Sequence, residues 1–230
     1  MKLSIVIPAY NEKNTILEII RRVKGIELDM EKEIIVVNNG SRDETGELLK
    51  TERGIKIITL NPNRGKGGAL KAGIKESTGD LVIFQDADLE YDPQDYPAMI
   101  RPILDGKTEV TNGVRTESRF RESNLITVGV LGWLGNHAIT WATNILYLNN
   151  AGEYEGCYKA FTAELLRSID VKTNDFDFDN ELICKILKRK YKTVDVPIHY
   201  YPRSYAEGKH INWKHGFKIL WTIIKYRFVN

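Results

Sequence analysis

Cysteine is scarce in this chain, which has only Cys157 and Cys184 among its 230 residues. Two cysteines cannot build the dense disulfide framework of a small secreted domain, and their separation does not match a zinc site. The opening apolar run, Leu3–Ile7, stops at Pro8 and is too short for the core of a secretory signal. We therefore expect a protein of a reducing, cytoplasmic compartment.

A strong charge of either sign is also missing. The 33 Lys and Arg residues against 31 Asp and Glu residues give a net charge of +2. This balance argues against a surface built for nucleic acid, and we expect no nucleic-acid partner. The charge is unevenly divided, because residues 185–230 hold 11 basic and two acidic side chains. The C-terminal part therefore carries +9 and the remainder −7.

Long apolar runs are few. Residues 125–148 carry no charge and are long enough to cross a bilayer core of about 30 Å. They also contain Asn136, His137, Asn144, threonines and glycines, which favour a buried or membrane-surface helix over a transmembrane one. A composition of 42% hydrophobic and 28% charged residues excludes a disordered tail, a collagen and a coiled coil.

The first half of the chain alternates short apolar runs with helical patterns. Continuous runs of Val, Ile and Leu predict strands at 3–7, 33–37, 55–60 and 81–84. Helical spacing predicts helices at 16–25, 43–50, 66–75 and 93–104. This succession predicts an α/β fold with a mostly parallel sheet and helices on both faces. Ligands of such sheets bind beyond the carboxyl ends of the strands.

The second half is less regular. We predict strands at 109–113 and 191–198, an Arg-rich loop at 114–124, and helices at 161–169, 180–190 and 212–228. The chain shows no internal repeat and no low-complexity linker. We therefore predict one domain, residues 1–211, followed by a C-terminal amphipathic helix, residues 212–230.

Each predicted strand of the first half is followed by a polar segment. In chain order these are Pro8–Glu12, Asn38–Asp43, Asn61–Gly68 and Asp86–Glu90. Taken singly, segments rich in Asn, Gly, Asp and Pro are ordinary turns. Four of them at one edge of a parallel sheet favour a ligand site instead.

Among these segments, the pair Asp86 and Asp88 is the clearest indication of a chemical role. Two carboxylates this close at the end of a buried strand need a cation to remain ionised together. Mg²⁺ or Mn²⁺ meets that need, because these ions prefer oxygen ligands and bridge substrate phosphates. The alternative is a solvated acidic turn. We predict the metal site.

The glycine-rich segment Gly65–Gly68 opens a predicted helix and includes Lys66. Backbone N–H groups, the positive end of a helix dipole and one lysine are the parts of a phosphate cradle. The spacing is not that of a P-loop. The segment is a moderate signal for nucleotide binding when it is followed by the Asp pair.

The order of these motifs resembles that of family-2 glycosyltransferases. More narrowly, the chain resembles the branch of dolichol-phosphate mannose synthases and polyprenyl-phosphate glycosyltransferases. The resemblance covers nearly the whole chain. The motifs that carry it are Ile5–Glu12, Asn38–Ser41, Asn63–Gly67, Gln85–Pro93, Cys157–Lys159, Asp177–Glu181, Tyr201–Arg203 and Glu207–Lys209.

The resemblance implies a GT-A fold, a Rossmann-like sheet with a nucleotide sugar along the strand-end edge. The residues that it places around the nucleotide and its phosphates are Pro8, Ala9, Tyr10, Glu12, Asn38, Gly65, Lys66, Asp86, Ala87 and Asp88. Asp86 and Asp88 would hold the metal, with Glu90 near enough to assist. The family usually has Asp where Asn38 and Asn39 stand, so the choice between UDP and GDP stays open. At residue 153 the chain has Glu where this branch commonly has Asp.

The resemblance also implies the reaction. A sugar would move, with inversion, from a UDP- or GDP-sugar to a dolichyl or undecaprenyl phosphate at the cytoplasmic face of a membrane. Because a phosphate is already an anion, the enzyme needs alignment and charge neutralisation more than a strong base. Asp88, with the metal, would face the leaving diphosphate.

Arg115, Arg203 and Lys209 are predicted to grip the acceptor and diphosphate phosphates, with surface solubility as the alternative. Asp179 and Glu181 open a predicted helix, where carboxylates also serve simply to complement the helix dipole. If the acceptor were a sugar hydroxyl instead, one of the two would be the natural general base.

The predicted terminal helix has one apolar and aromatic stripe. Its members recur at spacings of three and four, with basic residues around them: Trp213, Phe217, Leu220, Trp221, Ile224 and Phe228, flanked by Lys214, Lys218, Lys225 and Arg227. About 17 residues reach only about 25 Å, too short to span a bilayer. The pattern predicts a helix in the membrane interface, and the alternative is a helix packed on the domain.

Other functions remain possible from the sequence. A family-2 transferase could use a soluble or glycan hydroxyl acceptor. A phosphatase of the haloacid-dehalogenase type shares the strand-Asp-x-Asp pattern, but there the pair follows the first strand. A non-catalytic, nucleotide-binding membrane adaptor is the third alternative. The sugar, the lipid length and the oligomeric state are not predicted.

Overall fold

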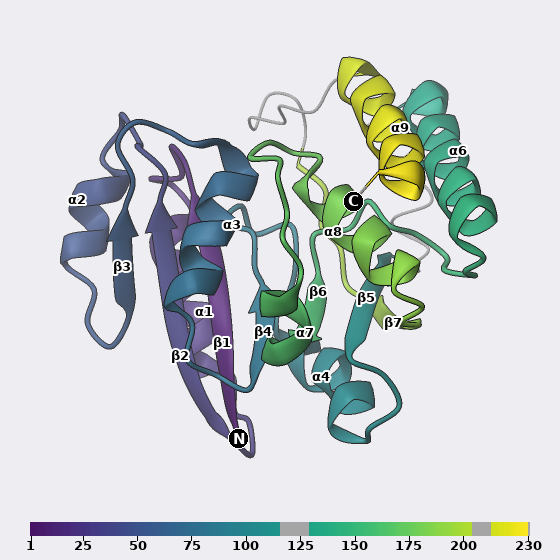
Figure 1. Cartoon of the computed structure of the whole chain (residues 1–230). Coiled ribbons are helices and arrows are strands. Elements are labelled where there is room, and N and C mark those ends of the chain that lie inside the picture. Colours follow the sequence, from purple (N-terminus) through teal and green to yellow (C-terminus); the bar gives the residue numbers. More distant parts are fainter. Residues whose placement is uncertain (116–128, 204–212, 230) are drawn as a thin grey trace.

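A seven-stranded sheet forms the centre of the molecule in the computed structural model, which describes residues 1–115, 129–203 and 213–229. The strand order is β3-β2-β1-β4-β6-β5-β7 (Figure 1). The strands are β1 (Lys2–Ala9), β2 (Glu31–Asn38), β3 (Lys56–Thr59), β4 (Leu81–Phe84), β5 (Val110–Arg115), β6 (Lys159–Thr162) and β7 (Thr193–Ile198).

The sheet is mostly parallel. β1 pairs in parallel with β2 and β4, β2 with β3, and β5 with β7. Only β6, among the described strands, runs antiparallel, and it does so to both β4 and β5. The predicted α/β architecture is therefore confirmed.

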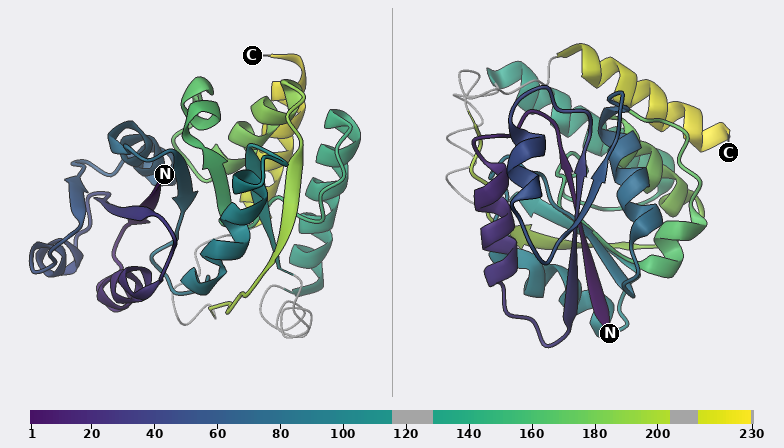
Figure 2. Two further views of the ribbon diagram at one scale, coloured as in Figure 1. Left: turned by 90° about the horizontal axis from the view of Figure 1, so that it is seen from below. Right: turned by 90° about the vertical axis from the view of Figure 1, so that its left-hand side faces the viewer.

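Helices cover both faces of the sheet (Figure 2). α3, α7 and α8 lie on one face, whereas α1 and α4 lie on the other (Figures 1 and 2). The helices are α1 (Ile16–Gly25), α2 (Thr45–Lys50), α3 (Gly65–Glu76), the 3-10 turn η1 (Pro93–Asp95), α4 (Tyr96–Leu104), α6 (Gly129–Tyr147), α7 (Ala163–Ser168), α8 (Phe178–Lys188) and α9 (Trp213–Phe228). The core is continuous across these layers.

β1 extends past the residue where the sequence predicted its end. The strand continues through Pro8 to Ala9, which pairs in register with Asn38. Proline cannot donate a ladder hydrogen bond, so it is normally excluded from central strands. β4 pairs with β1 only as far as Val6, and the N–H that Pro8 lacks therefore costs no bond to β4.

One predicted helix begins too early. The sequence predicted a helix over 161–169, whereas the structure has the unpredicted strand β6 at Lys159–Thr162 and then α7 at Ala163–Ser168. Thr162 marks the boundary, because its side-chain oxygen accepts a hydrogen bond from the Leu165 amide, 3.4 Å away, and caps α7. Phe161 is fully buried in the sheet rather than on a helix.

The uncharged segment 125–148 falls largely in α6, and residues 125–128 lie outside the described residues. α6 packs beside α9 (Figure 1). Thr143 and Tyr147 face the interior, while Trp141 and Ile145 are exposed. Among the described helices, none joins enough length to enough hydrophobicity for a membrane span.

Candidate active site

The carboxyl ends of β1, β2 and β4 bring the first predicted site residues together. Lys66, in the first turn of α3, places its Nζ 2.8 Å from Oδ1 and 3.1 Å from Oδ2 of Asp86, which follows β4. Burial alone would lower the pKa of Lys66, but the charge of Asp86, its hydrogen bond and the other neighbouring groups together outweigh burial and raise the pKa well above its usual value. Lys66 therefore keeps its positive charge at this edge of the sheet.

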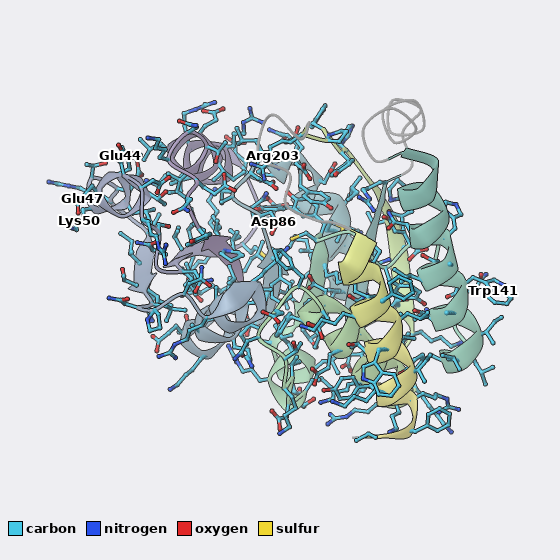
Figure 3. The ribbon with its side chains drawn as sticks, turned by 90° about the horizontal axis from the view of Figure 1, so that it is seen from above. Glu44, Glu47, Lys50, Asp86, Trp141 and Arg203 are labelled. Carbon is cyan, nitrogen blue, oxygen red and sulfur yellow. The ribbon has the colours of Figure 1, made fainter. Side chains whose placement is uncertain are left out.

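Arg203, which follows β7, joins carboxylates from two other loops at the same edge. Its Nη2 lies 2.8 Å from Oδ2 of Asp88, and its Nη1 lies 3.5 Å from Oε2 of Glu12. Its backbone N–H donates to Oε1 of Glu90 over 2.9 Å, and its Nε lies 3.7 Å from that oxygen. Asp86 and Arg203 lie on the same side of the molecule in Figure 3. Segments nearly 200 residues apart thus meet here.

The three carboxylates around Arg203 are each fixed by a further hydrogen bond. The Thr15 hydroxyl donates to Glu12 over 2.8 Å, and the Glu90 amide donates to Asp88 over 3.1 Å. The Tyr200 hydroxyl donates to Glu90 over 2.9 Å. The carboxylates are therefore positioned before any ligand arrives.

The charges of this cluster do not balance. Among the described residues, Lys66 pairs with Asp86, and Arg203 faces Glu12, Asp88 and Glu90, so four carboxylates share two cations. Burial, and then the charges of Asp86 and Glu90, raise the pKa of Asp88 to about 7. An all-oxygen donor set in which carboxylates outnumber cations suits a divalent cation.

The metal ligands predicted from the sequence were Asp86, Asp88 and Glu90. Within the described part of the chain, no three Asp, Glu, His or Cys side chains are grouped so that they could hold a metal by themselves. Glu90 faces Tyr200 and Arg203. A cation at Asp86 and Asp88 would therefore need oxygens from substrate or water to complete its coordination.

The raised pKa of Asp88 predicts a pH-dependent stability. The folded state holds a proton that the unfolded chain, with an ordinary value of 3.8, would release. The resulting stabilisation is present at acid pH and is lost as the pH rises through about 7. We expect Asp88→Asn, without metal, to melt a few degrees above the wild type at pH 8, with the difference growing smaller toward pH 5 and disappearing below the unfolded pKa of 3.8.

Thermal melts in EDTA across this pH range measure the difference between the two proteins. Asp105→Asn is the matched control, because the exposed Asp105 has a lowered pKa and titrates below this range. A difference in Tm between Asp88→Asn and wild type that stays constant from pH 5 to 8 would contradict the prediction.

The loops after β1 and β2 contain the residues predicted to hold the nucleotide. Tyr10 is 42% exposed at the sheet edge, whereas Ala9 and Asn38 are buried. The side-chain oxygen of Asn38 accepts a hydrogen bond from the Ser41 amide over 3.1 Å. Tyr10 therefore offers an open aromatic face, and Asn38 shapes the turn beneath it.

Asn39 explains why an amide stands where the family usually has Asp. Its Nδ2 donates to Oδ1 of Asn63 and to the Gly65 carbonyl over 3.3 and 3.0 Å. Its Oδ1 accepts from the Arg64 amide over 2.9 Å. A carboxylate has no N–H and would lose the two donated bonds. Asn39 thus ties the end of β2 to the start of α3.

Arg115 lies at the end of β5 and is largely enclosed, with only 8% of its side chain exposed. Its Nε lies 2.9 Å from Oε2 of Glu153, and its guanidinium stacks 4.8 Å from the centre of the Tyr200 ring. Tyr200 in turn bonds Glu90. Arg115 therefore contacts Tyr200, which bonds Glu90 beside Arg203, and Glu153 holds the Arg115 side chain in this position.

Asp179 and Glu181, in the first turn of α8, have different surroundings. Burial raises the pKa of Asp179, while the charges of Lys159 and Lys66 oppose that rise. Its Oδ1 is buried and, among the described residues, has no hydrogen-bond partner. Asp179 thus belongs to the neighbourhood of Lys66 and Asp86.

Glu181 is instead used to hold the loop before α8. Its carboxylate accepts from the Lys172 and Thr173 amides over 2.7 and 2.9 Å and pairs with Lys185 at 2.7 Å. Burial opposes ionisation, but these bonds hold the pKa of Glu181 below its usual value. A fully buried carboxylate with these partners is poorly placed to take a proton from a substrate.

Two buried residues near the site were not given a role from the sequence. Lys159 is fully buried on β6, and its Nζ donates to the carbonyls of Tyr154 and Gly156. Gln85 is also fully buried and donates from Nε2 to the Asp86 carbonyl over 3.0 Å. In the sequence, the available signals for a role were a lysine in the strand β6, Lys159, and a glutamine directly after β4, Gln85. Lys209 lies outside the described residues.

Several known proteins are similar in sequence to this chain. The family model of glycosyl transferase family 2 matches residues 4–148. An uncharacterized protein of Methanocaldococcus jannaschii is 30% identical over 96% of this chain and 90% of its own length. An undecaprenyl-phosphate 4-deoxy-4-formamido-L-arabinose transferase of Enterobacter is 30% identical over 91% of this chain. A transferase of the same name from Pseudomonas aeruginosa is 39% identical over 50% of it. The chain spans 62% and 35% of these two transferases.

Solved structures share the fold. Glucosyl-3-phosphoglycerate synthase of Mycobacterium tuberculosis, crystallised with Mn²⁺, UDP and phosphoglyceric acid, superposes with a TM-score of 0.70 at 20% identity. The match covers all of this chain and 79% of that one. The same synthase with Mg²⁺ and UDP gives a TM-score of 0.71, also at 20% identity, over 80% of its length. The fold is therefore that of the GT-A glycosyltransferases.

Proposed function

The chain belongs to glycosyl transferase family 2, and we propose that it transfers a sugar from a UDP- or GDP-sugar to a polyprenyl phosphate. The observation that carries the proposal is a cluster at the carboxyl edge of a GT-A sheet in which, among the described residues, four carboxylates share two cations: Glu12, Asp86, Asp88 and Glu90 with Lys66 and Arg203. The names of the Enterobacter and Pseudomonas transferases support undecaprenyl phosphate as acceptor, and dolichyl phosphate is the other polyprenyl phosphate that we propose.

The donor site is proposed at the edge formed by β1, β2 and β4. Pro8, Ala9, Tyr10, Glu12 and Asn38 would surround the nucleotide. The first turn of α3, with Gly65 and Lys66, would face the diphosphate, since helix N-termini and lysine both favour phosphate. Ala87 is buried between the two aspartates and would set their spacing.

Mg²⁺ or Mn²⁺ would be held by Asp86 and Asp88, with Glu90 assisting. The unbalanced charge of the cluster and the metals bound by the structural neighbours support this assignment. A divalent cation there would stabilise the negative charge of the leaving diphosphate. Lys66 and Arg203 would share that task and orient the phosphates.

The chemical step is a direct displacement. A phosphate oxygen of the acceptor forms a bond to the anomeric carbon while the bond from that carbon to the diphosphate breaks. The bonding electrons leave with the nucleoside diphosphate, and the configuration inverts. Arg203 and Arg115, with Lys209, would grip the phosphates, and no general base is required because the acceptor is already ionised.

A sugar hydroxyl is the second candidate acceptor. The buried, unpartnered oxygen of Asp179 and its raised pKa favour it, because a hydroxyl must lose a proton as it attacks. Under the leading proposal, Asp179→Asn lowers transfer only modestly. Under this second candidate it removes the general base and nearly abolishes transfer.

A panel of nucleotide sugars with a short polyprenyl phosphate tests the proposed function. We expect nucleoside diphosphate to be released only when the lipid phosphate is present. Release with a soluble glycan instead would favour the hydroxyl acceptor. Binding of nucleotide with no transfer to either acceptor would identify a non-catalytic adaptor.

We place the enzyme on the cytoplasmic face of a membrane, held by α9 after a domain of residues 1–211. Ile219 and Ile223 pack against the rest of the protein, whereas Phe217 is 70% and Trp221 65% exposed. Phe228 extends the exposed stripe, and the predicted members Trp213 and Lys214 have no described side chains. α9 therefore packs on the domain with one face and offers an aromatic face to lipid.

The double substitution Phe217→Ser and Trp221→Ser is expected to weaken binding to anionic vesicles at least about tenfold. Burying one large apolar side chain contributes about 1.5–3 kcal/mol, and two are lost. Co-sedimentation measures the effect. Leu104→Ser is the matched control, because Leu104 is also exposed, at 40%, but lies on α4. Equal vesicle binding by the double variant and the wild type would contradict the membrane assignment.

A further inference from the structure

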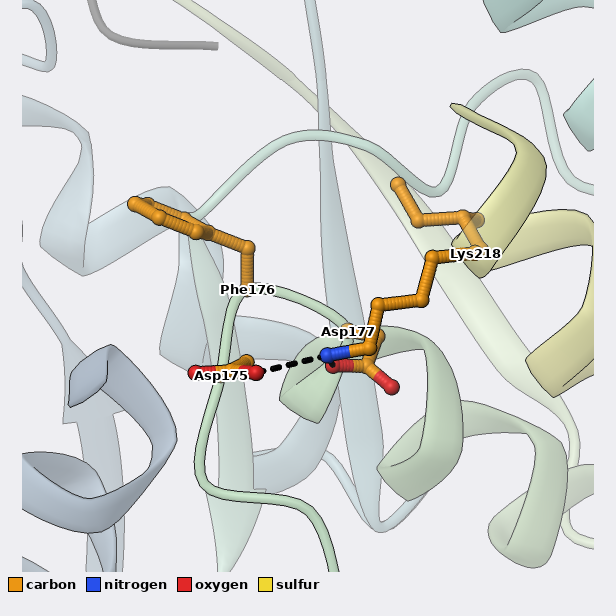
Figure 4. A pocket seen from close by; sticks show the side chains of 5 residues that line it. Asp175, Phe176, Asp177 and Lys218 are labelled. Carbon is orange, nitrogen blue, oxygen red and sulfur yellow. Dashed lines mark hydrogen bonds and ion pairs between the residues drawn. The ribbon is translucent and has the colours of Figure 1, made fainter. Parts of the chain in front are cut away.

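α9 is fastened to the loop before α8 by a network of charged and hydroxyl groups, in which Asp177 and Thr222 are buried and Lys218 is half-exposed. Lys218 places its Nζ 2.7 Å from Oδ2 of Asp175 and 3.0 Å from Oδ1 of Asp177 (Figure 4). The Thr222 hydroxyl donates to Oδ2 of Asp177 over 3.1 Å. Burial alone would raise the pKa of Asp177, but hydrogen bonds from Lys218 and Thr173 outweigh it and lower the pKa. Asp177 thus stays ionised and holds α9.

The same junction borders a small pocket of about 220 Å³, lined by Asp175, Phe176, Asp177, Lys218 and Ile219. Lys218 reaches across its floor from α9 to the loop (Figure 4). Lys218 therefore bridges the two elements beside the bond from Thr222 to Asp177.

The loop that Lys218 holds is rigid at its other end. The Thr173 hydroxyl donates to Asp177 over 2.8 Å, and the Thr173 amide donates to Glu181 over 2.9 Å. Between these anchors, the Asn174 carbonyl accepts a hydrogen bond from the Gly68 amide over 3.0 Å. The loop therefore contacts the first turn of α3 through its backbone.

The contact with α3 leaves no space for a side chain at residues 65 and 67. A Cβ at residue 65 would collide with the Asn174 carbonyl oxygen, and one at residue 67 would lie 2.9 Å from its carbonyl carbon. Only glycine permits this approach, and at Gly65 it also permits a φ of 75°. A shift of Asn174 would consequently shift the turn that carries Lys66.

We propose that Lys218 is a positioning residue for the donor site: from α9, it sets the place of Asn174 and so of the phosphate-facing first turn of α3. This inference rests on the proposed donor site. α9 then has two tasks, because one face contacts lipid while Lys218 supports nucleotide binding from the other side. Removing the bridge frees the loop and misplaces the N–H groups and Lys66.

Isothermal titration of UDP and GDP with Mn²⁺ into the full chain, without lipid, tests the inference. We expect Lys218→Met to weaken binding of the preferred nucleotide about two- to fivefold, because the half-exposed Lys218 loses its ion pair with the buried Asp177. Lys225→Met is the matched control: it removes the same charge from α9, but its Nζ contacts the Tyr226 ring, 4.9 Å from its centre. It should leave affinity unchanged.

Two further variants separate positioning from general damage to the fold. Lys218→Arg should retain nucleotide affinity, and Asp177→Asn combined with Lys218→Met should be no worse than the single change. Equal affinity of Lys218→Met and Lys225→Met would overturn the inference, as would a loss that Lys218→Arg does not prevent. Failure of the wild type to bind either nucleotide would instead overturn the proposed function.

Discussion

Replacing Asp88 by Asn is expected to reduce sugar transfer by about a thousandfold or more. The change keeps the shape of the side chain but removes the charge that lies 2.8 Å from Arg203 and beside Asp86. Without that charge, a divalent cation loses a ligand, and the negative charge of the leaving diphosphate is no longer neutralised. Together these two losses raise the activation barrier by several kcal/mol. Steady-state assays with saturating metal and donor measure the loss.

The same variant separates chemistry from folding. Because Asp88 is costly to ionise in the free protein, Asp88→Asn should be at least as stable as the wild type at pH 8. Metal-dependent nucleotide binding should disappear together with transfer. Glu47→Gln is the matched control, since Glu47 is 75% exposed on α2, away from Asp86 in Figure 3. Wild-type turnover by Asp88→Asn would refute the site.

The strands were the most predictable part of the molecule. β4 occupies the residues predicted for it, 81–84, because it is buried throughout and reads as a continuous apolar run. β6 was missed because its four residues begin with Lys159, and a charged residue breaks the apolar pattern that defines a buried strand. Its antiparallel direction depends on partners far away in the chain, which no local pattern records.

The motifs predicted which residues gather at this edge of the sheet, whereas long-range contacts decide how they pair. Lys66 pairs with Asp86 and Asp88 lies beside Asp86, and the roles of all three stay a prediction. The pattern at 177–181 could not distinguish Asp179, with an unpartnered oxygen, from Glu181, which holds a loop. Both sit in the first turn of α8, and only the packing of the preceding loop gives them different tasks.

The terminal helix packs on the domain with one face, and its place in a membrane interface stays a proposal. Its apolar positions were predictable from the spacing of three and four residues, but the sequence could not say which apolar face meets protein. The structure buries Ile219, Ile223 and Tyr226 and exposes Phe217 and Trp221. Deletion of α9 is consequently expected to affect nucleotide binding as well as lipid binding, which a simple anchor would not do.

Arg203→Gln is expected to lower transfer about a hundred- to a thousandfold by a different route from Asp88→Asn. Arg203 is the one cation within contact of Glu12, Asp88 and Glu90 among the described residues. In the reaction, its planar fork would bind phosphate oxygens and stabilise the charge that develops between donor and acceptor. Glutamine fills similar space but carries no charge.

The two variants should therefore differ in how they bind metal. Removing Arg203 increases the excess of negative charge, so affinity for Mn²⁺ should hold or rise while kcat falls. Asp88→Asn should lose both. Arg101→Gln is the matched control, because Arg101 is also ion-paired, 2.8 Å from Asp105, yet 74% of its side chain is exposed. If Arg203→Gln lost metal affinity in parallel with turnover, Arg203 would only support the fold of the cluster, and another residue would have to grip the phosphates.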